Sequence, residues 1–466
     1  MSIDISGRDR KVASAPVTIS IPENHPLVLL AAILPWALLM DLVVQDLKKT
    51  TAKGCWWLGR KIKVRVHLGA FLLSKLYNLS DRKLEYGLRD NAAYRLFCGC
   101  NIISEWHAPD HTKIEEFRSR LSPETQRTIA NEISKAAVAL GFADPQETDF
   151  DSTVQQANIA YPSDASLLTK LVQMGRKVID FVKQKITRIP QKSLVEVNLK
   201  KAKEYARKYF FQPRNTNIER RRKVFKDLYT FVKKQMLPVI DICNQLTENE
   251  VAGMPWNISQ TFHQIHEKAL RYLKDVAYFI RNHTIKPGKI LSFHAREVSC
   301  IKKGKPGKEM EFGRIFQLGR IKGNFLFIGP PTPPRNADRN SLIPLVSEHA
   351  SLFGEGTLKS VAADKGYWKK SNQEQLIKCG LKEIGIQRPS NVKSPVGLPT
   401  QEVQDRLKDR RAGIEPLIGH AKHGGQLGKS RMKSDSATLA AGYSSILGLN
   451  LRQLIRHQAG KIKLAV

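Results

Sequence analysis

The sequence has few acidic residues for its length and no long apolar run. Its 466 residues include 43 Asp and Glu against 76 Lys and Arg, so the net charge is +33. A charge excess of this size repels itself unless a polyanion binds, and each phosphate that is neutralised releases condensed counterions. Because no lipidation motif is present, a membrane surface is the weaker partner. The composition therefore favours a nucleic-acid-binding protein.

The most apolar stretch, residues 27–40, is 14 residues long and contains Pro35. A membrane helix needs about 20 apolar residues, so we interpret this stretch as one buried helix of a first domain. The start of the chain shows no signal-peptide pattern, and residues 1–20 are polar and predicted to be disordered. These features predict a cytoplasmic protein without a membrane partner.

The six cysteines lack the spacing of a disulfide scaffold, which indicates free thiols in a reducing compartment. Cys98 and Cys100 form a cluster with two histidines that follow them, His107 and His111. Zinc accepts these ligand types, but a spacing of one between the cysteines is tight and Pro109 separates the histidines. Buried thiols beside a helix start are therefore the favoured interpretation, with a structural zinc site as the alternative.

Two regions have helical patterning. Residues 21–142 show the apolar spacing of several short helices with basic faces, which suits a helix-turn-helix type DNA-binding domain or a plain helical bundle. Residues 165–285 carry more than twice as many Lys and Arg as Asp and Glu. A charge run is usually a solvated face, but a surplus on long helices favours a surface that follows a phosphate backbone. The densest run of this basic insertion contains Arg220, Arg221 and Arg222.

The segments 143–164 and 286–466 combine strands with helices, which predicts a mixed α/β fold. The helical insertion interrupts this domain after its first strand, 149–154, which a loop precedes. Apolar residues at every second position indicate the later strands, and apolar residues at helical spacing indicate the helices. The expected strands are 289–294, 298–301, 312–318, 324–328, 358–363 and 385–388, and the expected helices are 340–352, 374–379, 406–423 and 438–458.

Three carboxylates lie on different elements of this domain. Asp151 is in the first strand, Asp364 ends a later strand, and Glu415 is on the helix 406–423. Two-metal cleavage of a phosphodiester needs carboxylates that converge from different elements, since the two cations stabilise both the attacking and the leaving oxygen. Magnesium prefers oxygen ligands and keeps several waters, so a few carboxylates suffice.

Basic residues accompany the third acid. Arg411 precedes Glu415 by four residues and Lys422 follows it by seven, so one helical face presents all three. That face suits a DNA strand, although an ordinary surface ion pair between Arg411 and Glu415 explains the same spacing. Other acids compete for the site. The strongest is Asp149, which shares a strand face with Asp151, and the others are Asp164, Glu297, Glu311 and Asp338.

Ordered stretches along most of the chain resemble the DDE transposases of bacterial insertion sequences. The resemblance is to the subgroup with a helical N-terminal domain and a ribonuclease-H-like catalytic core. The family pattern around the third acid is Tyr, two residues, Arg, three residues, Glu, six residues and Lys, and Lys408 stands here in place of the Tyr. The matching stretches are 68–73, 77–81, 97–99, 110–118, 151–154, 161–164, 302–305, 311–313, 363–367 and 411–422.

The resemblance implies that Asp151, Asp364 and Glu415 are the catalytic residues and bind Mg²⁺ or Mn²⁺, two ions in all. An enzyme of this kind nicks DNA at the ends of its insertion sequence, and the freed 3′-hydroxyl then attacks target DNA. DNA contacts are expected at Arg411, Lys422 and Lys365.

The resemblance also implies double-stranded DNA as the partner, both element ends and target, and a homodimer or larger assembly on DNA. The expected location is the bacterial cytoplasm, with the nucleoid when DNA is bound. Two alternatives stay open. One is a transposase-derived DNA-binding protein without catalysis, against which the presence of all three acids argues. The other is a nuclease or resolvase on the same fold, which would cut DNA without joining it.

Overall fold

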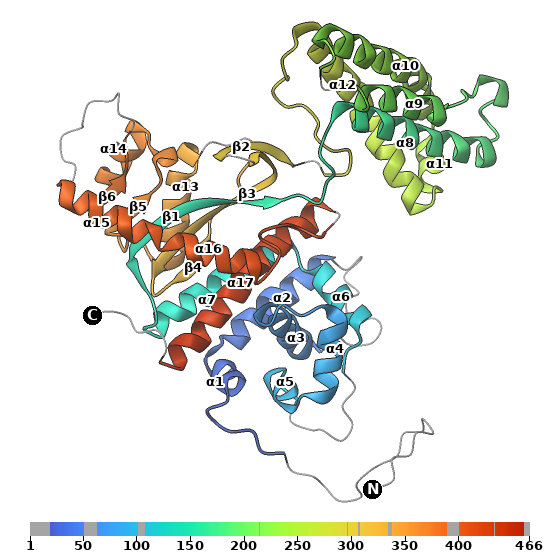
Figure 1. Cartoon of the computed structure of the whole chain (residues 1–466). Helices are drawn as coiled ribbons and strands as arrows, with labels where there is room; N and C mark the ends of the chain where they lie inside the picture. Colours follow the sequence, from blue (N-terminus) through green and yellow to red (C-terminus); the bar gives the residue numbers. More distant parts are fainter. Residues whose placement is uncertain are drawn as a thin grey trace, which may run out of the picture. The chain divides into compact units, whose positions relative to one another are not determined.

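The computed structural model describes most of the chain, and residues 1–18 of the expected disordered start lie outside the described part. The chain forms two compact units. The sheet unit comprises residues 1–156, 315–431 and 436–466, and the insertion unit comprises 157–314 and 432–435 (Figure 1). The described stretches are 19–50, 63–100, 108–213, 215–295, 297–305, 308–333, 338–388, 400–432 and 434–460.

The helical N-terminal region is confirmed. Polar side chains cap its helices, because Ser80, Asn91, Asp110 and Ser122 each accept hydrogen bonds from backbone N–H groups of the first turn that follows. The helices are α1 (Pro26–Ile33), α2 (Trp36–Thr50), α3 (Val64–Leu76), α4 (Asp81–Asp90), α5 (Ala92–Phe97), α6 (His111–Arg120) and α7 (Pro123–Ala139).

The single buried helix expected over residues 27–40 is wrong, because the chain bends at Pro35. Leu34 is extended, with ψ 138°, as the residue before a proline prefers to be. α1 and the following helix are bent by 72° from each other. Within the described residues no single helix is long and apolar enough to cross a membrane, although this bent pair meets the criteria of length and composition when taken together.

A mixed six-stranded sheet confirms the mixed α/β expectation. Its order is β2-β3-β1-β5-β6, and β4 also pairs with β3. β1, β5 and β6 are parallel neighbours, whereas β3 is antiparallel to β2 and β4. The strands are β1 (Asp144–Gln156), β2 (Ser299–Lys305), β3 (Lys308–Lys322), β4 (Phe325–Ile328), β5 (Ser360–Ala363) and β6 (Glu383–Ile386).

Helices connect the parallel strands and close the fold. α13 (Leu342–Phe353) lies between β4 and β5 in the chain, and α14 (Lys370–Lys378) lies between β5 and β6. Short 3-10 turns, η3 (Asp338–Asn340) and η4 (Lys365–Tyr367), precede each of these helices. The C-terminal helices are α15 (Gln401–Ala412), α16 (Ile414–His423) and α17 (Asp435–Gln458).

Two expected strand features differ from the structure. The first strand starts at Asp144, where a loop was predicted. Residues 289–294 do not form a strand, because Ser292 closes a local turn by accepting a hydrogen bond from the N–H of Ala295 at 3.2 Å. Phe293 of this segment packs on Tyr272 with ring centroids 5.2 Å apart. Its apolar residues therefore reflect docking on a helix rather than the pleat of a sheet.

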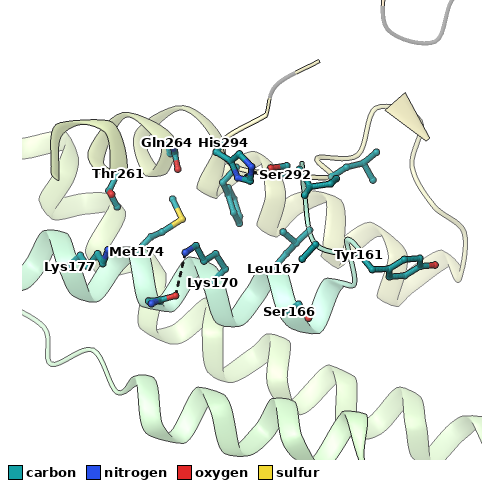
Figure 2. Close-up of a pocket in the computed structure, with 15 residues that line it drawn as sticks. Tyr161, Ser166, Leu167, Lys170, Met174, Lys177, Thr261, Gln264, Ser292 and His294 are labelled. Carbon is teal, nitrogen blue, oxygen red and sulfur yellow. Dashed lines mark hydrogen bonds between the residues drawn. The ribbon is translucent and has the colours of Figure 1, made fainter. Parts of the chain in front are cut away.

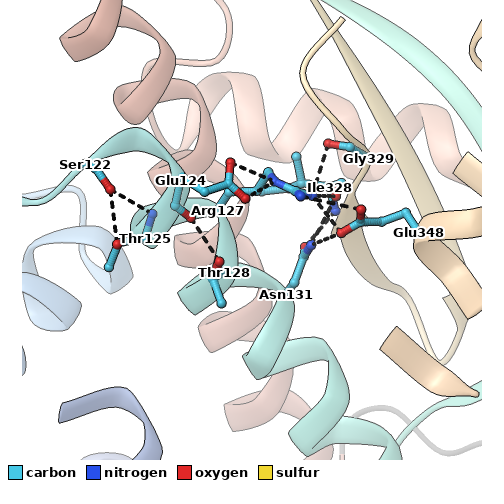
Figure 3. A network of polar contacts seen from close by, with 9 residues as sticks. All are labelled: Ser122, Glu124, Thr125, Arg127, Thr128, Asn131, Ile328, Gly329 and Glu348. Atoms are coloured by element: carbon cyan, nitrogen blue, oxygen red, sulfur yellow. Dashed lines mark hydrogen bonds and ion pairs between the residues drawn. The ribbon is translucent and has the colours of Figure 1, made fainter. Parts of the chain in front are cut away.

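Side chains from two helices occupy the free edge of β4. Asn131 of α7 accepts from the N–H of Ile328 at 2.8 Å and donates to its carbonyl at 3.0 Å. Asn450 of α17 does the same for Leu326, at 3.0 and 2.7 Å. Arg127, which also pairs with Glu348 at 2.6 Å, donates to the Ile328 carbonyl at 3.0 Å (Figure 3). An edge strand exposes unpaired backbone groups, and these contacts satisfy them.

Within the sheet unit, α17 also packs closely against the N-terminal helix α3. A Cβ at Gly448 would lie 2.4 Å from the carbonyl oxygen of Lys75, so only glycine permits this close approach of α3. One turn later, Arg452 donates to the carbonyls of Lys75 and Leu76 at 3.2 and 3.0 Å. These carbonyls belong to the last turn of α3, which lacks partners within its own helix.

The insertion unit has a hydrophobic core of its own, built from α8, α10 and α12 together with α9. Asp164 joins two distant parts of this unit, because its carboxylate accepts from the Tyr272 hydroxyl at 3.0 Å and pairs with Lys289. The helices are α8 (Asp164–Lys185), α9 (Leu199–Phe210), α10 (Ile218–Gln245), α11 (Glu248–Ala252) and α12 (Trp256–Asn282), with the 3-10 turn η2 (Gln191–Ser193) between α8 and α9.

Candidate functional site

The first two candidate acids lie at matching positions of two neighbouring parallel strands: Asp151 is within β1, and Asp364 directly follows β5. Asp149 is paired with Ala362 and Phe150 with Ala363, so Asp151 and Asp364 come next at the same edge of the sheet. The crevice outside the carboxyl ends of parallel strands is where open α/β sheets bind ligands. Asp364 is exposed, whereas the side chain of Asp151 is 19% exposed.

The third acid is linked to the first by Arg411. Its Nη1 lies 3.9 Å from Oδ2 of Asp151, and its Nη2 lies 3.6 Å from Oε1 of Glu415. The ion pair between Arg411 and Glu415 that the spacing allowed is therefore present, and the same guanidinium faces the acid on β1. Burial raises the pKa of Asp151 to about 6, and the negative charges of Asp364 and Glu415 act in the same direction. The structure thus brings the three acids into one electrostatic neighbourhood.

The helix expected over residues 406–423 is divided at Gly413, which is a correction. Pro416 cannot donate to the carbonyl of Ala412, and its ring clashes with that carbonyl in a continuous helix. A Cβ at Gly413 would also lie 2.1 Å from Nη1 of Arg320. Arg411 and Glu415 are therefore on different helices, yet the αR conformation of Gly413 keeps them about one turn apart.

Asp149 has a different environment from Asp151. It is 3% exposed, and Nε of Arg410 lies 2.8 Å from its Oδ1 while Nη1 of Arg320 lies 3.3 Å from its Oδ2. Both carboxylate oxygens thus face arginines. Arg410 further donates to the Ser360 hydroxyl at 2.8 Å, which joins α15 to β5. This geometry assigns Asp149 to the support of β1. Sequence patterns did not single out Arg320 or Arg410, because the chain contains 76 Lys and Arg residues and nothing in their spacing distinguishes these two.

A buried polar chain lies behind the acids. The Tyr367 hydroxyl donates to Oε1 of Gln317, and Nε2 of Gln317 donates to Asp338 at 2.9 Å. Burial raises the pKa of Tyr367 well above its ordinary value, and the charges of Asp338 and Asp151 act in the same direction. Gln317 and Tyr367 are both almost fully buried. The only sequence signal for them was the stretch 363–367, where Tyr367 follows Asp364 by three residues.

The remaining rival acids have partners elsewhere. Asp164 is held by Tyr272 and Lys289, and Glu297 pairs with Arg314 at 2.5 Å; both belong to the insertion unit. Glu311 is on β3, opposite Ile301 of β2. Among the rivals, Asp338 is the one that contacts the chain behind the site.

The expected DNA-contacting residues fall in two places. In the sheet unit, Lys365 and Arg411 line a small cavity beside Asp364, which Lys408 also lines. Lys365 borders a second, larger hollow of about 640 Å³ with Arg339 and Lys369. Lys422 is partly buried in the last turn of α16. In the insertion unit, Arg220, Arg221 and Arg222 lie in the first turns of α10, and Arg221 donates to the Pro213 carbonyl at 2.9 Å.

The donor set at the sheet edge consists of carboxylates, which are the ligands that magnesium and manganese prefer. Among the described residues, however, no three side chains of His, Cys, Asp or Glu converge closely enough to hold a metal ion. The guanidinium of Arg411 lies between Asp151 and Glu415 instead. The residue types therefore fit a hard divalent cation, and the acids need to move closer together to bind it.

The possible zinc cluster has other contacts. Cys98 is buried and burial raises the pKa of its thiol, so the thiolate that zinc requires is disfavoured. Glu85 accepts from the backbone N–H of His111 at 2.9 Å and contacts its Nδ1 at 2.8 Å. His107 lies outside the described residues. The described contacts favour the interpretation of Cys98 as a buried thiol.

Comparison with known proteins finds a similarity in the helical N-terminal region. Residues 17–120 match the family model described as Transposase domain (DUF772). This match suggests a transposase-related function. A similar protein of Rhizobium meliloti, described as "Uncharacterized protein ORF8 in nfe locus", is 26% identical over 196 residues, which cover 40% of this chain and 87% of that protein. No solved structure matches the chain.

Proposed function

We propose that the protein is a DDE-type DNA transposase, in which Asp151, Asp364 and Glu415 bind two Mg²⁺ or Mn²⁺ ions on a ribonuclease-H-like core. The observation that carries the proposal is the register of β1 and β5, which puts Asp151 and Asp364 directly after the last paired residues of these two strands. Arg411, within 4 Å of Asp151 and Glu415, connects the third acid to them. The family match over residues 17–120 and the net charge of +33 support a DNA substrate.

Each residue has a role in this proposal. The three carboxylates hold the cations, which when bound stabilise the attacking and leaving oxygens of the phosphodiester. Arg411 neutralises Asp151 and Glu415 before the cations bind, and it faces the DNA strand afterwards. Lys365 and the cations around the 640 Å³ hollow hold phosphates next to Asp364. The sheet order, with parallel β1, β5 and β6 beside antiparallel β3 and β4, agrees with a ribonuclease-H-like core.

Cleavage and joining of DNA test this function directly. The substrate is a labelled duplex that carries the ends of the insertion sequence, identified from inverted repeats that flank the gene. We expect nicking and joined products only with Mg²⁺ or Mn²⁺, and a loss on the order of 10³-fold in Asp151→Asn, Asp364→Asn and Glu415→Gln. DNA binding of the three variants should stay within about twofold of the wild type. Full cleavage by any variant removes that residue from the site.

One observation favours a second candidate function. Because no described trio of acids converges on a metal position, a transposase-derived protein that binds DNA without cutting it accounts for the same fold and charge. The same assay separates the two, since this protein would bind end-containing DNA but yield no nicked product with either cation. Nicking without joined 3′ ends would instead indicate a nuclease or resolvase on this fold.

A further inference from the structure

The insertion unit has a groove along α8 that is lined without acidic residues. On one side of α8 is a cavity of about 450 Å³, where Figure 2 shows Lys170 and Lys177 together with Thr261 and Gln264 of α12. On the other side, between α8 and α9, is a hollow of about 330 Å³. Both share three residues of α8, so they form one surface, which we call the α8 groove. The shared residues are Ser166, Lys170 and Gln173.

Helical periodicity explains why these side chains form a stripe. Ser166, Lys170, Gln173 and Lys177 follow each other at spacings of four, three and four, which keeps them on one face of α8. The opposite face supplies buried core residues such as Leu171. Neighbouring residues of α9 add Lys203 and Arg207, one turn apart, and the small Ala206 leaves space between the two helices.

The four cations of the groove, Lys170, Lys177, Lys203 and Arg207, are exposed. None of them has a carboxylate within 4 Å among the described residues, and Lys170 donates to the neutral amide oxygen of Gln173 at 3.5 Å. On another face of α8, by contrast, Arg176 pairs with Asp180 at 3.5 Å. Unpaired cations concentrated along one stripe, with hydroxyls and amides between them, are the chemistry that recognises a phosphate backbone.

We propose that the α8 groove binds the backbone of double-stranded DNA and is the insertion unit's contact with the substrate. This inference rests on the proposed function only in taking DNA as the partner. The stripe from Ser166 to Lys177 is roughly 16 Å long at 1.5 Å per residue, which matches about five phosphates along one strand. It differs from the run Arg220–Arg222, which composition alone had favoured and where Arg221 already donates to a backbone carbonyl.

The test is the salt dependence of DNA binding by the full chain. The groove variant combines Lys170→Gln, Lys177→Gln, Lys203→Gln and Arg207→Gln. A control variant with the same change in net charge combines Lys183→Gln, Lys185→Gln, Lys233→Gln and Lys234→Gln, all of them exposed and outside the groove. Affinity for an end-containing duplex is measured by fluorescence anisotropy between 50 and ~300 mM salt, and thermal melts confirm that both variants are folded.

We expect the groove variant to bind DNA more than tenfold more weakly than the wild type near ~150 mM salt. Its slope of log K against log salt should be shallower by roughly 3 to 4, because each lost phosphate contact removes about 0.9 from the slope. The control should change the slope by less than about 1. An equal effect of both variants overturns the proposal, as does wild-type binding by the groove variant.

The outcome is separable from that of the proposed function. Asp151→Asn should keep the wild-type salt slope, because it lies in the other unit and removes no cation. If the wild type never cleaves DNA but the groove variant loses affinity, the groove stands and the transposase proposal fails. If the wild type cleaves and the groove variant binds normally, the groove is wrong and the transposase proposal stands.

Discussion

Two regions of β1, around Asp149 and around Asp151, differ although the two acids are only two residues apart on one strand face. Asp149 is almost completely buried and its two oxygens face Arg410 and Arg320. Asp151 is partly exposed, has one guanidinium at 3.9 Å, and is close to two further negative charges. The first region is neutralised and supports the fold. The second keeps an excess of negative charge, which is the property that a divalent cation requires.

The largest difference is expected in stability when each acid is removed. Asp149→Asn removes the carboxylate that pairs with Arg320 and leaves Arg410 with only the more exposed Glu147, 3.3 Å from its Nη1. Breaking a buried pair in this way costs about 3–5 kcal/mol. Asp151→Asn removes a charge from a negative neighbourhood and should leave the free energy of unfolding at pH 7 unchanged or higher. Urea denaturation of both variants without divalent metal measures the difference. Equal destabilisation by both changes would remove the distinction between the two regions.

The next effect concerns pH. The pKa of Asp151 is about 6 in the folded protein, whereas an unperturbed Asp has a pKa near 4. Between about pH 4 and pH 6, the folded state therefore keeps a proton on Asp151 that the unfolded state has already released. The contribution of Asp151 to stability is therefore most favourable below pH 4 and is lost as the pH rises through 6. We expect the wild type to lose up to about 3 kcal/mol relative to Asp151→Asn across this interval.

Parallel urea titrations of the wild type and Asp151→Asn at several pH values, without metal, give this difference directly. A difference that stays constant from pH 4 to pH 7 would show that Asp151 has an ordinary pKa. Asp151 would then resemble an exposed carboxylate rather than one of a crowded acidic group.

The smallest effect is expected at Arg411. Its contacts at 3.9 and 3.6 Å are long and partly exposed, so Arg411→Ala should change the free energy of unfolding by less than about 1 kcal/mol. Its positive charge lowers the pKa of Asp151, so the midpoint of the pH transition should move upward in the variant. Lys408→Ala, on the same helix, is the matched control and should leave the midpoint in place. A downward shift would contradict the proposed role of Arg411.

Several features of the fold could be predicted from the sequence. The alternation of apolar residues located most of the strands, and the polar caps located the N-terminal helices, because both patterns are local. The strand expected at 289–294 was wrong, since alternating burial also arises where a loop docks on α12. The division of the helix at Gly413 has a local cause in Pro416, which the helical spacing of Arg411 and Glu415 concealed.

The sequence by itself determined the basic charge, the mixed α/β class, and the presence of three candidate acids on separate elements. It could not distinguish Asp149 from Asp151, because a spacing of two puts both on the same strand face. Only the tertiary structure decided between them. Arg320 comes from β3 and Arg410 from α15, both far from residue 149 in the chain, and folding brings both to the same carboxylate. The negative charge that remains uncompensated two residues later, at Asp151, is therefore a property of packing and not of sequence pattern.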